Sequence, residues 1–475
     1  MKDSNVDFKD KIGTVDSLGK RIWVYAKKPF GKFFNYRQIV GYTLLAILFI
    51  VPFIKVNGEP LVLFNIVERK FIILSMVFTT QDMYMFAIMM LILMVFIVLF
   101  TVVFGRLFCG WVCPQTIFME LVFRRIEYYI EGDYNQQKKL NNANWTSEKI
   151  FKKTSKHIIF FSIAFAIGNI FLAYIIGMDE VIAIITDPVS SHFSGLAAMI
   201  FFSLLFYGVF AFFREQVCVA VCPYGRLQSV MLDSNSIVVM YDWVRGEPRG
   251  KKRREKPSVE GFLNIDNTIP RGDCVDCDLC VKVCPTGIDI RNGTQLECVN
   301  CTACMDACDQ VMEKVGREKG LIRYDAYDNI ANHKIFKIFN KRAIAYSIVL
   351  GLLVVLQSFL LFNRSDAELV VQRTPGMLFQ ENEDGTVSNL YNYQIINKMT
   401  QEISDLELRV KDDIGTIKEI GAVNNVEMQE TGSGSFFVIL PEENIHGSKN
   451  KITIELYVND KLIDKVKTNF LGPIK

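Results

Sequence analysis

Histidine is scarce in this chain, and its charges nearly cancel. The 475 residues contain four histidines and no C-x-x-C-H sequence. A transmembrane haem needs paired histidines at the right depth, so we do not expect a haem protein. The formal net charge is only +2. The one strongly basic run, residues 251–254, is interpreted as a solvated stretch beside a membrane, and no nucleic-acid partner is expected.

Cysteine is absent from residues 309–475, although the chain contains twelve cysteines. They fall in three groups: Cys109 with Cys113, Cys218 with Cys222, and eight between Cys274 and Cys308. A secreted disulfide scaffold would spread its cysteines through its folded domains. Tight groups spaced by two or three residues indicate metal ligands instead.

Long apolar runs predict a membrane protein. Half of the residues are apolar and the mean hydropathy is +0.22. Five runs approach the ~20 residues that cross a ~30 Å hydrocarbon layer: residues 38–54, 83–104, 158–177, 193–213 and 343–362. The apolar stretch 61–78 is interrupted by charges and is predicted to be interfacial. Residues 1–37 are too long and too polar for a signal peptide.

The number of lysine and arginine residues alternates between high and low in the successive segments that separate these runs. Segments 1–37 and 105–157 hold nine each, segment 55–82 holds three and segment 178–192 holds none. By the positive-inside rule, residues 1–37 and 214–342 are cytoplasmic and the residues after 362 are periplasmic. We therefore expect a bacterial inner-membrane protein with these parts: 1–37 cytoplasmic; 38–230, four spans; 231–342, cytoplasmic; 343–362, fifth span; 363–475, periplasmic.

Residues 274–308 carry the pattern of a two-cluster ferredoxin. Two C-x2-C-x2-C-x3-C sequences stand thirteen residues apart, and the fourth cysteine of each such motif ligates the other cluster. The pattern predicts two [4Fe–4S] clusters with the following ligands: Cys274, Cys277, Cys280 and Cys308 for the first, and Cys298, Cys301, Cys304 and Cys284 for the second. Zinc prefers four ligands in paired knuckles, so it fits poorly. Asp309 replaces the usual proline after the last cysteine.

Acidic side chains crowd these cysteines in the sequence. The residues concerned are Asp273, Asp276, Asp278 and Asp306. Negative charge beside an iron–sulfur cluster favours its oxidised form, so we expect these residues to lower the cluster potentials.

The other four cysteines form two copies of a C-x3-C-P motif. Cys109 and Cys113 follow the second apolar run, and Cys218 and Cys222 follow the fourth. A spacing of four places two side chains on one helical face. If the copies face each other, four thiolates converge and suit Cu(I), another cluster or a dithiol redox centre.

Two alternatives to a thiol site would also place cysteines at these positions. Cysteine also serves as a small buried apolar residue, but two aligned copies favour function over that reading. A disulfide is not expected on the reducing side of the membrane. An arginine precedes each pair, Arg106 and Arg214, and both are expected to lower the thiol pKa values.

Residues 365–475 alternate apolar and polar positions in short runs. These runs include 389–399, 405–410, 435–441 and 451–470. They predict an all-β sandwich of about seven strands. The methionines of this segment, Met377, Met399 and Met428, are interpreted as core residues rather than copper ligands. The segment is therefore expected to be a docking module.

Taken over nearly its whole length, the chain resembles the CcoG/FixG/RdxA family of cytochrome c oxidase accessory proteins. The resemblance rests on the twin C-x3-C-P motifs, the two-cluster pattern before the last span and the cysteine-free outer segment. It implies an immunoglobulin-like C-terminal domain and reduction of Cu(II) to Cu(I) during assembly of cbb3-type oxidase. The implied partners are that oxidase or its copper chaperones, and a homodimer is compatible with the sequence.

Three functions therefore remain open. The leading hypothesis is an oxidoreductase that passes electrons from an unidentified cytoplasmic donor through the clusters to Cu(II) at the thiols. In this hypothesis Cys109, Cys113, Cys218 and Cys222 are catalytic and bind copper. The alternatives are a quinol-linked membrane ferredoxin and a non-catalytic assembly scaffold.

Overall fold

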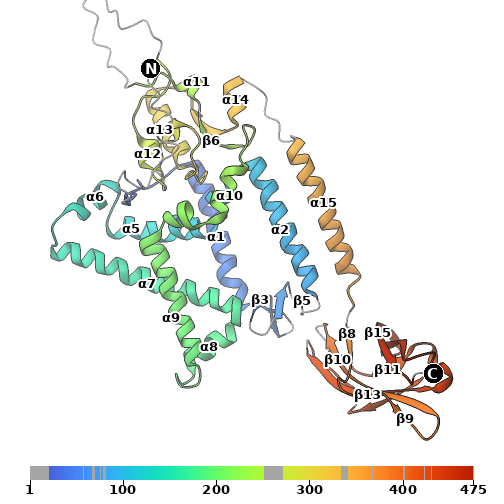
Figure 1. Ribbon diagram of the computed structural model, residues 1–475. Helices are drawn as coiled ribbons and strands as arrows, with labels where there is room; N and C mark the ends of the chain where they lie inside the picture. The colour runs from blue at the N-terminus through green and yellow to red at the C-terminus, as the bar shows by residue number, and fades with distance from the viewer. Residues whose placement is uncertain are drawn as a thin grey trace, which may run out of the picture. The chain divides into compact units, whose positions relative to one another are not determined.

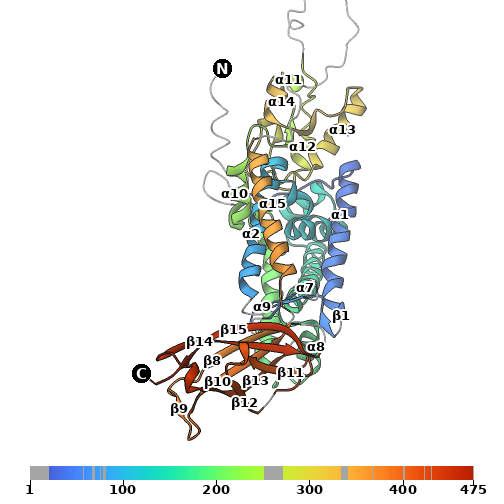
Figure 2. The same cartoon turned by 90° about the vertical axis from the view of Figure 1, so that its right-hand side faces the viewer.

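The computed structural model describes residues 21–56, 58–66, 70–74, 76–78, 82–250, 271–332, 341–365, 367–398, 402–421, 423–428 and 430–473. The basic run 251–254, His333 and Met399 lie outside these residues. The chain divides into two compact units. Residues 1–54 and 88–354 form unit 1, and residues 55–87 and 355–475 form unit 2. Figures 1 and 2 show the elements from two sides.

Five helices are long and apolar enough to cross a membrane, among the residues that the structure describes. They are α1 (Lys32–Ile50), α2 (Met83–Phe104), α7 (Ser147–Ile176), α9 (Phe193–Gly208) and α15 (Lys341–Phe362). Each contains most of one predicted apolar run, so the five expected helices are confirmed. Helix α7 begins at Ser147, before the apolar run, because the Thr146 side chain accepts a hydrogen bond from the Lys149 amide and caps it.

Short helices follow α2 and α9. After α2 come α3 (Leu107–Trp111), α4 (Pro114–Ile117), the π-helical turn η3 (Phe118–Phe123), α5 (Arg124–Ile130) and α6 (Tyr134–Asn142). After α9 come η4 (Val209–Phe213), η5 (Val217–Val221) and α10 (Pro223–Met231). Helix α8 (Met178–Thr186) connects α7 to α9.

An aromatic core holds the first set of short helices against α7 and α9. Phe123 stacks on Phe210 at 4.4 Å between ring centroids and meets Phe160 edge-on at 4.8 Å. All three side chains are at most 1% exposed.

Residues 232–332, called here the cysteine-rich domain, combine two paired strands with short helices. Strand β6 (Val238–Tyr241) pairs antiparallel with β7 (Ile322–Asp325). The helices are α11 (Trp243–Gly246), α12 (Leu279–Lys282), α13 (Ala303–Val315) and α14 (Tyr327–Asn332), with a 3₁₀ turn, η7 (Ile290–Asn292). Every residue of β6 is buried, which explains why its sequence is apolar without alternation.

The start of α1 is fixed on this domain by a carboxylate from α13. The Asp306 carboxylate accepts hydrogen bonds from the amides of Phe33 and Phe34, at 3.1 and 2.8 Å. These amides lie in the first turn of α1, where no intrahelical acceptor exists. Asp306 therefore caps a helix that begins after Gly31 and has no capping side chain of its own.

Within the described residues after 366, unit 2 contains two antiparallel sheets with one core. One sheet has the order β12-β13-β10-β8 with β9 beside β10, and the other has the order β11-β14-β15. The strands are β8 (Ala367–Arg373), β9 (Gln380–Glu381), β10 (Thr386–Asn397), β11 (Leu406–Val410), β12 (Thr416–Ile420), β13 (Thr431–Pro441), β14 (Lys449–Val458) and β15 (Lys461–Leu471). Strands are present in all of the predicted runs, and β8, β9 and β12 are additional.

The core and the turns of these sheets follow from the sequence. Tyr391, Phe436 and Phe470 are fully buried between the sheets. Asn459 and Asp460 both have positive φ, the geometry of a two-residue hairpin turn that joins β14 to β15.

The segment predicted to be interfacial forms strands and belongs to unit 2. The strands β1 (Lys55–Val56) and β2 (Glu59–Pro60) pair with each other, and β3 (Val62–Asn65), β4 (Lys70–Ile73) and β5 (Met76–Phe78) form a three-stranded sheet. Just beyond them, buried Asp82 forms ion pairs with Arg364 and Lys398, at 2.7 and 2.8 Å. The apolar run therefore reflects a strand pairing that its local composition did not reveal.

Candidate metal centres

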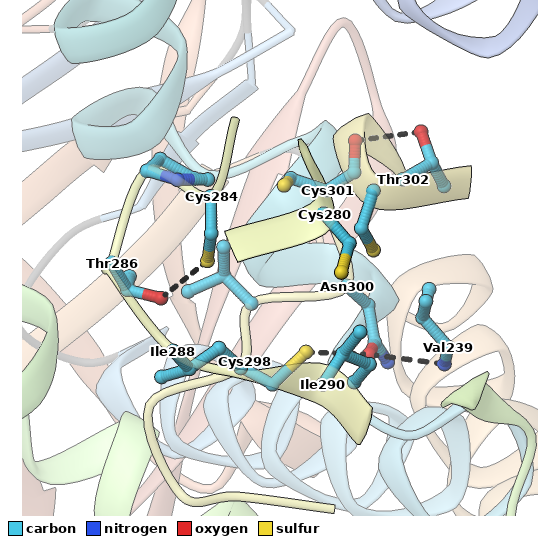
Figure 3. A pocket seen from close by; sticks show the side chains of 13 residues that line it. Val239, Cys280, Cys284, Thr286, Ile288, Ile290, Cys298, Asn300, Cys301 and Thr302 are labelled. Atoms are coloured by element: carbon cyan, nitrogen blue, oxygen red, sulfur yellow. Dashed lines mark hydrogen bonds between the residues drawn. The ribbon is translucent and has the colours of Figure 1, made fainter. Parts of the chain in front are cut away.

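Two cavities in the cysteine-rich domain are each bordered by at least four cysteines. Each has a volume of about 350 Å³. The first is bordered by Cys280, Cys284, Cys298, Cys301 and Cys304, and Figure 3 shows four of these side chains around one space. The second is bordered by Cys274, Cys277, Cys280 and Cys308. All eight cysteines of the two-cluster pattern thus line one or both cavities.

The two C-x2-C-x2-C loops have the same backbone conformation. Asp276 and Asp278 in the first loop have φ of 51° and 58°, and Asn300 and Thr302 at the matching places in the second have 53° and 66°. A left-handed conformation costs a residue other than glycine about 1–2 kcal/mol. Such strain persists where the surroundings impose it, and turns of this kind direct successive amides toward an anion. The loops are therefore shaped to wrap a compact anionic group.

Burial keeps these thiols protonated in the absence of metal. It raises the pKa of Cys301 to about 11 and the pKa values of Cys280 and Cys298 to about 12. Metal ligation requires the thiolate, so metal binding must displace these protons. Four-cysteine linings, buried thiols and anion-binding loops all fit iron–sulfur clusters.

The acidic residues near the cysteines are paired, which bears on one expectation. Arg291 binds Asp276, Asp278 and Asp289 at 2.7–2.8 Å. Asp306 is occupied by the amides at the start of α1. These pairings offset part of the negative charge beside the cysteines, and the expected lowering of the cluster potentials stays a prediction.

The two C-x3-C-P motifs do not lie each on one continuous helical face, as we expected. Cys109 lies in α3, but Cys113 has ψ of 123° and is the N-cap of α4. Cys218 lies in η5, and Cys222 has ψ of 111° and is the N-cap of α10. A residue before proline avoids the helical region, and proline favours the first helical position. The proline therefore ends one helix and places the second thiol at the start of the next.

The four thiols of the two motifs nevertheless come together. In every pair among Cys109, Cys113, Cys218 and Cys222, the two thiols lie close enough for a negative charge on one to raise the pKa of the other. We call this group the thiol quartet. Within the described residues, no three His, Cys, Asp or Glu side chains stand close enough to hold a single metal ion. The thiols of the quartet and the cysteines around the two cavities are therefore all spaced more widely than the ligands of a single metal ion.

The arginines affect the quartet differently from our expectation. Arg106 lowers the pKa of Cys109 as expected, but burial outweighs it and raises the pKa of Cys109 to about 11 and that of Cys218 to about 12. Arg106 opposes the rise at Cys109, whereas Arg214 pairs with Glu127 at 2.8 Å. Arg106 is 3% exposed, and its Nε and Nη1 atoms have no hydrogen-bond partner among the described residues. A buried cation of this kind suits a quartet that becomes anionic when it binds metal.

The first motif packs directly on the cysteine-rich domain. Cys109 belongs to one apolar cluster with Val299 and Cys301, and Cys304 packs against it. Gly110 is essential to this approach, because a Cβ atom there would lie 2.4 Å from the Val299 carbonyl oxygen. The thiol of Cys109 also donates to the Gln228 side chain at 3.0 Å.

Trp111 adds a hydrogen-bonded connection to the same loop. Its Nε1 donates to the Tyr324 hydroxyl at 3.1 Å, and that hydroxyl donates to the Asn300 carbonyl at 3.1 Å. Sequence reasoning did not single out Gly110, Trp111, Tyr324 or Gln228. Gly110 and Trp111, between the two cysteines, were the only local signal.

The second motif borders another cavity, of about 310 Å³, that reaches the same domain. Cys218 lines it together with Glu215 of the same segment and with Pro285 and Thr286. Pro285 and Thr286 also border the first cysteine-lined cavity. Cys109 of the first motif and Cys218 of the second motif therefore both lie beside residues that border the first cysteine-lined cavity.

Three family models match the chain. A 4Fe-4S dicluster domain matches residues 213–327, a 4Fe-4S binding domain matches residues 86–127, and the Ig-like fold at the C-terminus of FixG matches residues 358–473. The chain is 31% identical to the nitrogen fixation protein FixG of Rhizobium meliloti, over 81% of this chain and 78% of that protein.

Two relatives from Cereibacter sphaeroides give the same result. Protein RdxA is 32% identical over 74% of this chain and 75% of its own length, and protein RdxB is 29% identical over 94% and 95%. The chain belongs to the FixG/RdxA family. The resemblance seen in the sequence is thereby confirmed.

This FixG/RdxA-family chain is a membrane iron–sulfur electron-transfer protein. It combines ferredoxin-type 4Fe–4S domains, five apolar helices and an Ig-like C-terminal domain. The 4Fe–4S models cover both C-x3-C-P motifs as well as the eight cysteines of the cavities.

Proposed function

We propose that this FixG/RdxA-family chain passes electrons from two [4Fe–4S] clusters to the thiol quartet and reduces Cu(II) to Cu(I) there. One cluster would be held by Cys274, Cys277, Cys280 and Cys308, and the other by Cys284, Cys298, Cys301 and Cys304. The clusters supply one-electron storage. Cys109, Cys113, Cys218 and Cys222 would bind copper and be the catalytic residues.

One observation carries this proposal: the packing of Cys109 with Cys301 and Cys304 in a single apolar cluster. A thiol of the quartet and two thiols of a cluster cavity are thus neighbours in one buried apolar cluster. The hydrogen bonds from Trp111 to Tyr324 and on to Asn300 hold the two loops in register. Electrons would therefore have a short route through packed side chains between the two sites.

The chemistry of the quartet favours copper as the acceptor. Thiolates are soft ligands that select Cu(I) over harder cations, so they stabilise the reduced product. Each Cu(II) takes one electron, and two reduced clusters supply two copper ions in turn. The charge of buried Arg106 compensates the thiolates, and the amides of Gln115 and Thr116 direct hydrogen bonds at the Cys113 thiol.

The same proposal includes sidedness and partners. Segments rich in lysine and arginine, 1–37 and 105–157, alternate with poor ones and support a cytoplasmic cluster domain, 231–342. The Ig-like domain, within 363–475, would then be periplasmic and dock a cbb3-type oxidase or its copper chaperones. A non-catalytic scaffold remains the alternative that the experiments below separate.

The test is Cu(I) production by purified protein. Dithionite-reduced protein is mixed with Cu(II) and a Cu(I)-specific chelator, and iron per chain is counted. We expect about eight iron atoms, two clusters of four. Cys222→Ala should abolish Cu(I) production and retain the iron, because Cys222 stands outside the packed cluster around Cys109. Met377 is exposed, which contradicts the prediction that it belongs to the core, so Met377→Leu is the matched control and should change nothing.

Three outcomes would contradict the proposal. Unchanged Cu(I) production in both Cys109→Ala and Cys222→Ala would remove the quartet from the reaction. About twelve iron atoms per chain, falling by about four in Cys222→Ala, would place a third cluster on the quartet instead. Clusters that never change oxidation state would exclude electron transfer and leave the non-catalytic scaffold as the remaining function.

A further inference from the structure

An open groove of about 1130 Å³ runs along the first half of α7 in unit 1. Trp145, Ile158 and Phe161 form apolar walls, and Lys153, His157 and Tyr207 supply polar atoms. None of these residues borders the thiol quartet or the cysteine-lined cavities. Ile158 and Trp145 are 61% and 74% exposed, so the walls are open to an apolar ligand.

A hydrogen-bonded pair of rings stands in this groove. The Tyr207 hydroxyl bonds to Nδ1 of His157 at 2.9 Å. The imidazole also stacks on Phe212, with 21° between the ring planes, so its orientation is fixed. In the part of the chain that the structure describes, Nε2 of His157 makes no hydrogen bond and can serve a ligand.

We propose that this groove is a quinol-oxidation site that supplies the electrons of the cluster domain. A membrane quinol has an aromatic head with two hydroxyl groups and an apolar tail. The aromatic walls match the head, His157 can accept a hydroxyl proton, and the exposed apolar residues match the tail. A phospholipid headgroup would match Lys153 but would leave the fixed imidazole–phenol pair without a role.

A chain of contacts leads from the groove toward the thiol quartet. The guanidinium of Arg21 bonds to the carbonyl of Phe212 and, at 2.8 Å, to the carboxylate of Glu215. Glu215 lines the cavity that Cys218 and Pro285 share. Phe212, whose ring stacks on His157, is therefore connected through Arg21 and Glu215 to residues that border the first cysteine-lined cavity.

Buried ion pairs lead away from the groove and provide a route for protons. Lys153 binds Glu131 at 2.9 Å, and Lys156 joins Glu131 to Glu127 at 2.9 and 3.6 Å. Arg214 binds Glu127 at 2.8 Å and, because a guanidinium keeps its proton, it anchors this carboxylate instead of carrying protons. Ionisable groups buried beside membrane helices are costly, and they commonly mark proton relays. A quinol site needs such a relay because its reaction releases two protons.

The reaction balances with the cofactors of the proposed function. One quinol is oxidised to a quinone, releasing two electrons and two protons. Two oxidised [4Fe–4S] clusters are each reduced by one electron, and the protons leave through His157 and the carboxylates. The inference rests on the proposed function only for these acceptors, and binding in the groove can be measured without them.

Binding is the first test. Decylubiquinone and menadione are titrated into the oxidised full-length protein in nanodiscs, and quenching of tryptophan fluorescence reports occupancy beside Trp145. We expect Tyr207→Phe, which keeps the packed ring, to weaken binding about three- to tenfold, the effect of one hydrogen bond. His157→Ala should weaken it at least as much. His192→Ala, at a histidine outside the groove, is the matched control and should bind normally.

Electron entry is the second test. The corresponding quinols are mixed anaerobically with oxidised protein, and bleaching of the cluster absorbance is followed. We expect bleaching in the wild type and in His192→Ala, a rate at least about tenfold lower in His157→Ala, and full reduction of all variants by dithionite. Unaltered binding and bleaching in both groove variants, or reduction of quinone by the protein with no reverse reaction, would overturn the inference. Failure of dithionite-driven Cu(II) reduction alone would instead count against the proposed function.

Discussion

The contact made by Gly110 gives the sharpest test of the link between the thiol quartet and the cysteine-rich domain. In Gly110→Ala, the new Cβ would lie 2.4 Å from the Val299 carbonyl oxygen and 2.9 Å from that of Asn300. Both obstacles are backbone atoms of a loop that borders the first cysteine-lined cavity, so no side-chain rotation relieves the overlap. The motif and the loop must move apart.

The size of the effect follows from the overlap. An ordinary contact between an aliphatic carbon and a carbonyl oxygen is roughly 3.3–3.6 Å, so the two segments must separate by about 1 Å. Overpacking of this kind costs about 1–3 kcal/mol, which is about 5- to 150-fold in the equilibrium between docked and separated arrangements. The displacement falls on Cys109 and Cys301, which share one apolar cluster.

The assay compares cluster content with electron delivery. We expect Gly110→Ala to keep its iron while the reoxidation of dithionite-reduced clusters by Cu(II) slows by about tenfold, within the range above. Gly208→Ala is the matched control, because a Cβ there meets nothing within 4 Å. Equal reoxidation rates in the wild type and Gly110→Ala would refute the argument that this contact carries the electrons.

Two further predictions concern side chains that bind the cysteine-rich domain. Arg291→Ala leaves the carboxylates of Asp276 and Asp278 without their ion pairs, so the potential of the adjacent cluster should fall by roughly 70 mV, for charges roughly 10 Å apart at an effective dielectric of about 20. A redox titration measures this potential, and Arg409→Ala in unit 2 is the control. An Arg291→Ala potential equal to that of Arg409→Ala would contradict the prediction. Asp306→Ala removes the cap of α1 at a cost of about 1–2 kcal/mol, and hydrogen exchange at the start of α1 should accelerate, whereas Asp384→Ala should leave it unchanged.

Local patterns predicted much of this fold. The five apolar helices follow from run length, because a membrane span is defined by composition over about 20 residues. Strands β14 and β15 largely coincide with the predicted alternating run 451–470, and the turn that divides this run uses Asn459 and Asp460, residues that tolerate positive φ. The family resemblance followed from the spacing of cysteines, which survives at about 30% identity.

Long-range partners explain what the sequence did not predict. Arg214 stands four residues before Cys218, yet its charge is taken by Glu127, which is remote in the chain. Strands β3, β4 and β5 depend on pairing with one another, so the stretch looked like an apolar surface segment when considered alone. The contact of Gly110 with Val299 is likewise invisible until both loops are placed.

The proline after each C-x3-C pair already indicated that the two thiols of a pair would not share one helical face. We expected each C-x3-C pair on one helical face, but Pro114 and Pro223 push the preceding cysteine out of the helical region. The second thiol of each pair then stands at a helix start, where unsatisfied amides favour a thiolate. The first thiol stays in the preceding turn. A repeat of this unit can therefore bring four thiols together from two short breaks in helical structure, whereas two uninterrupted helices would present each pair along a rigid axis.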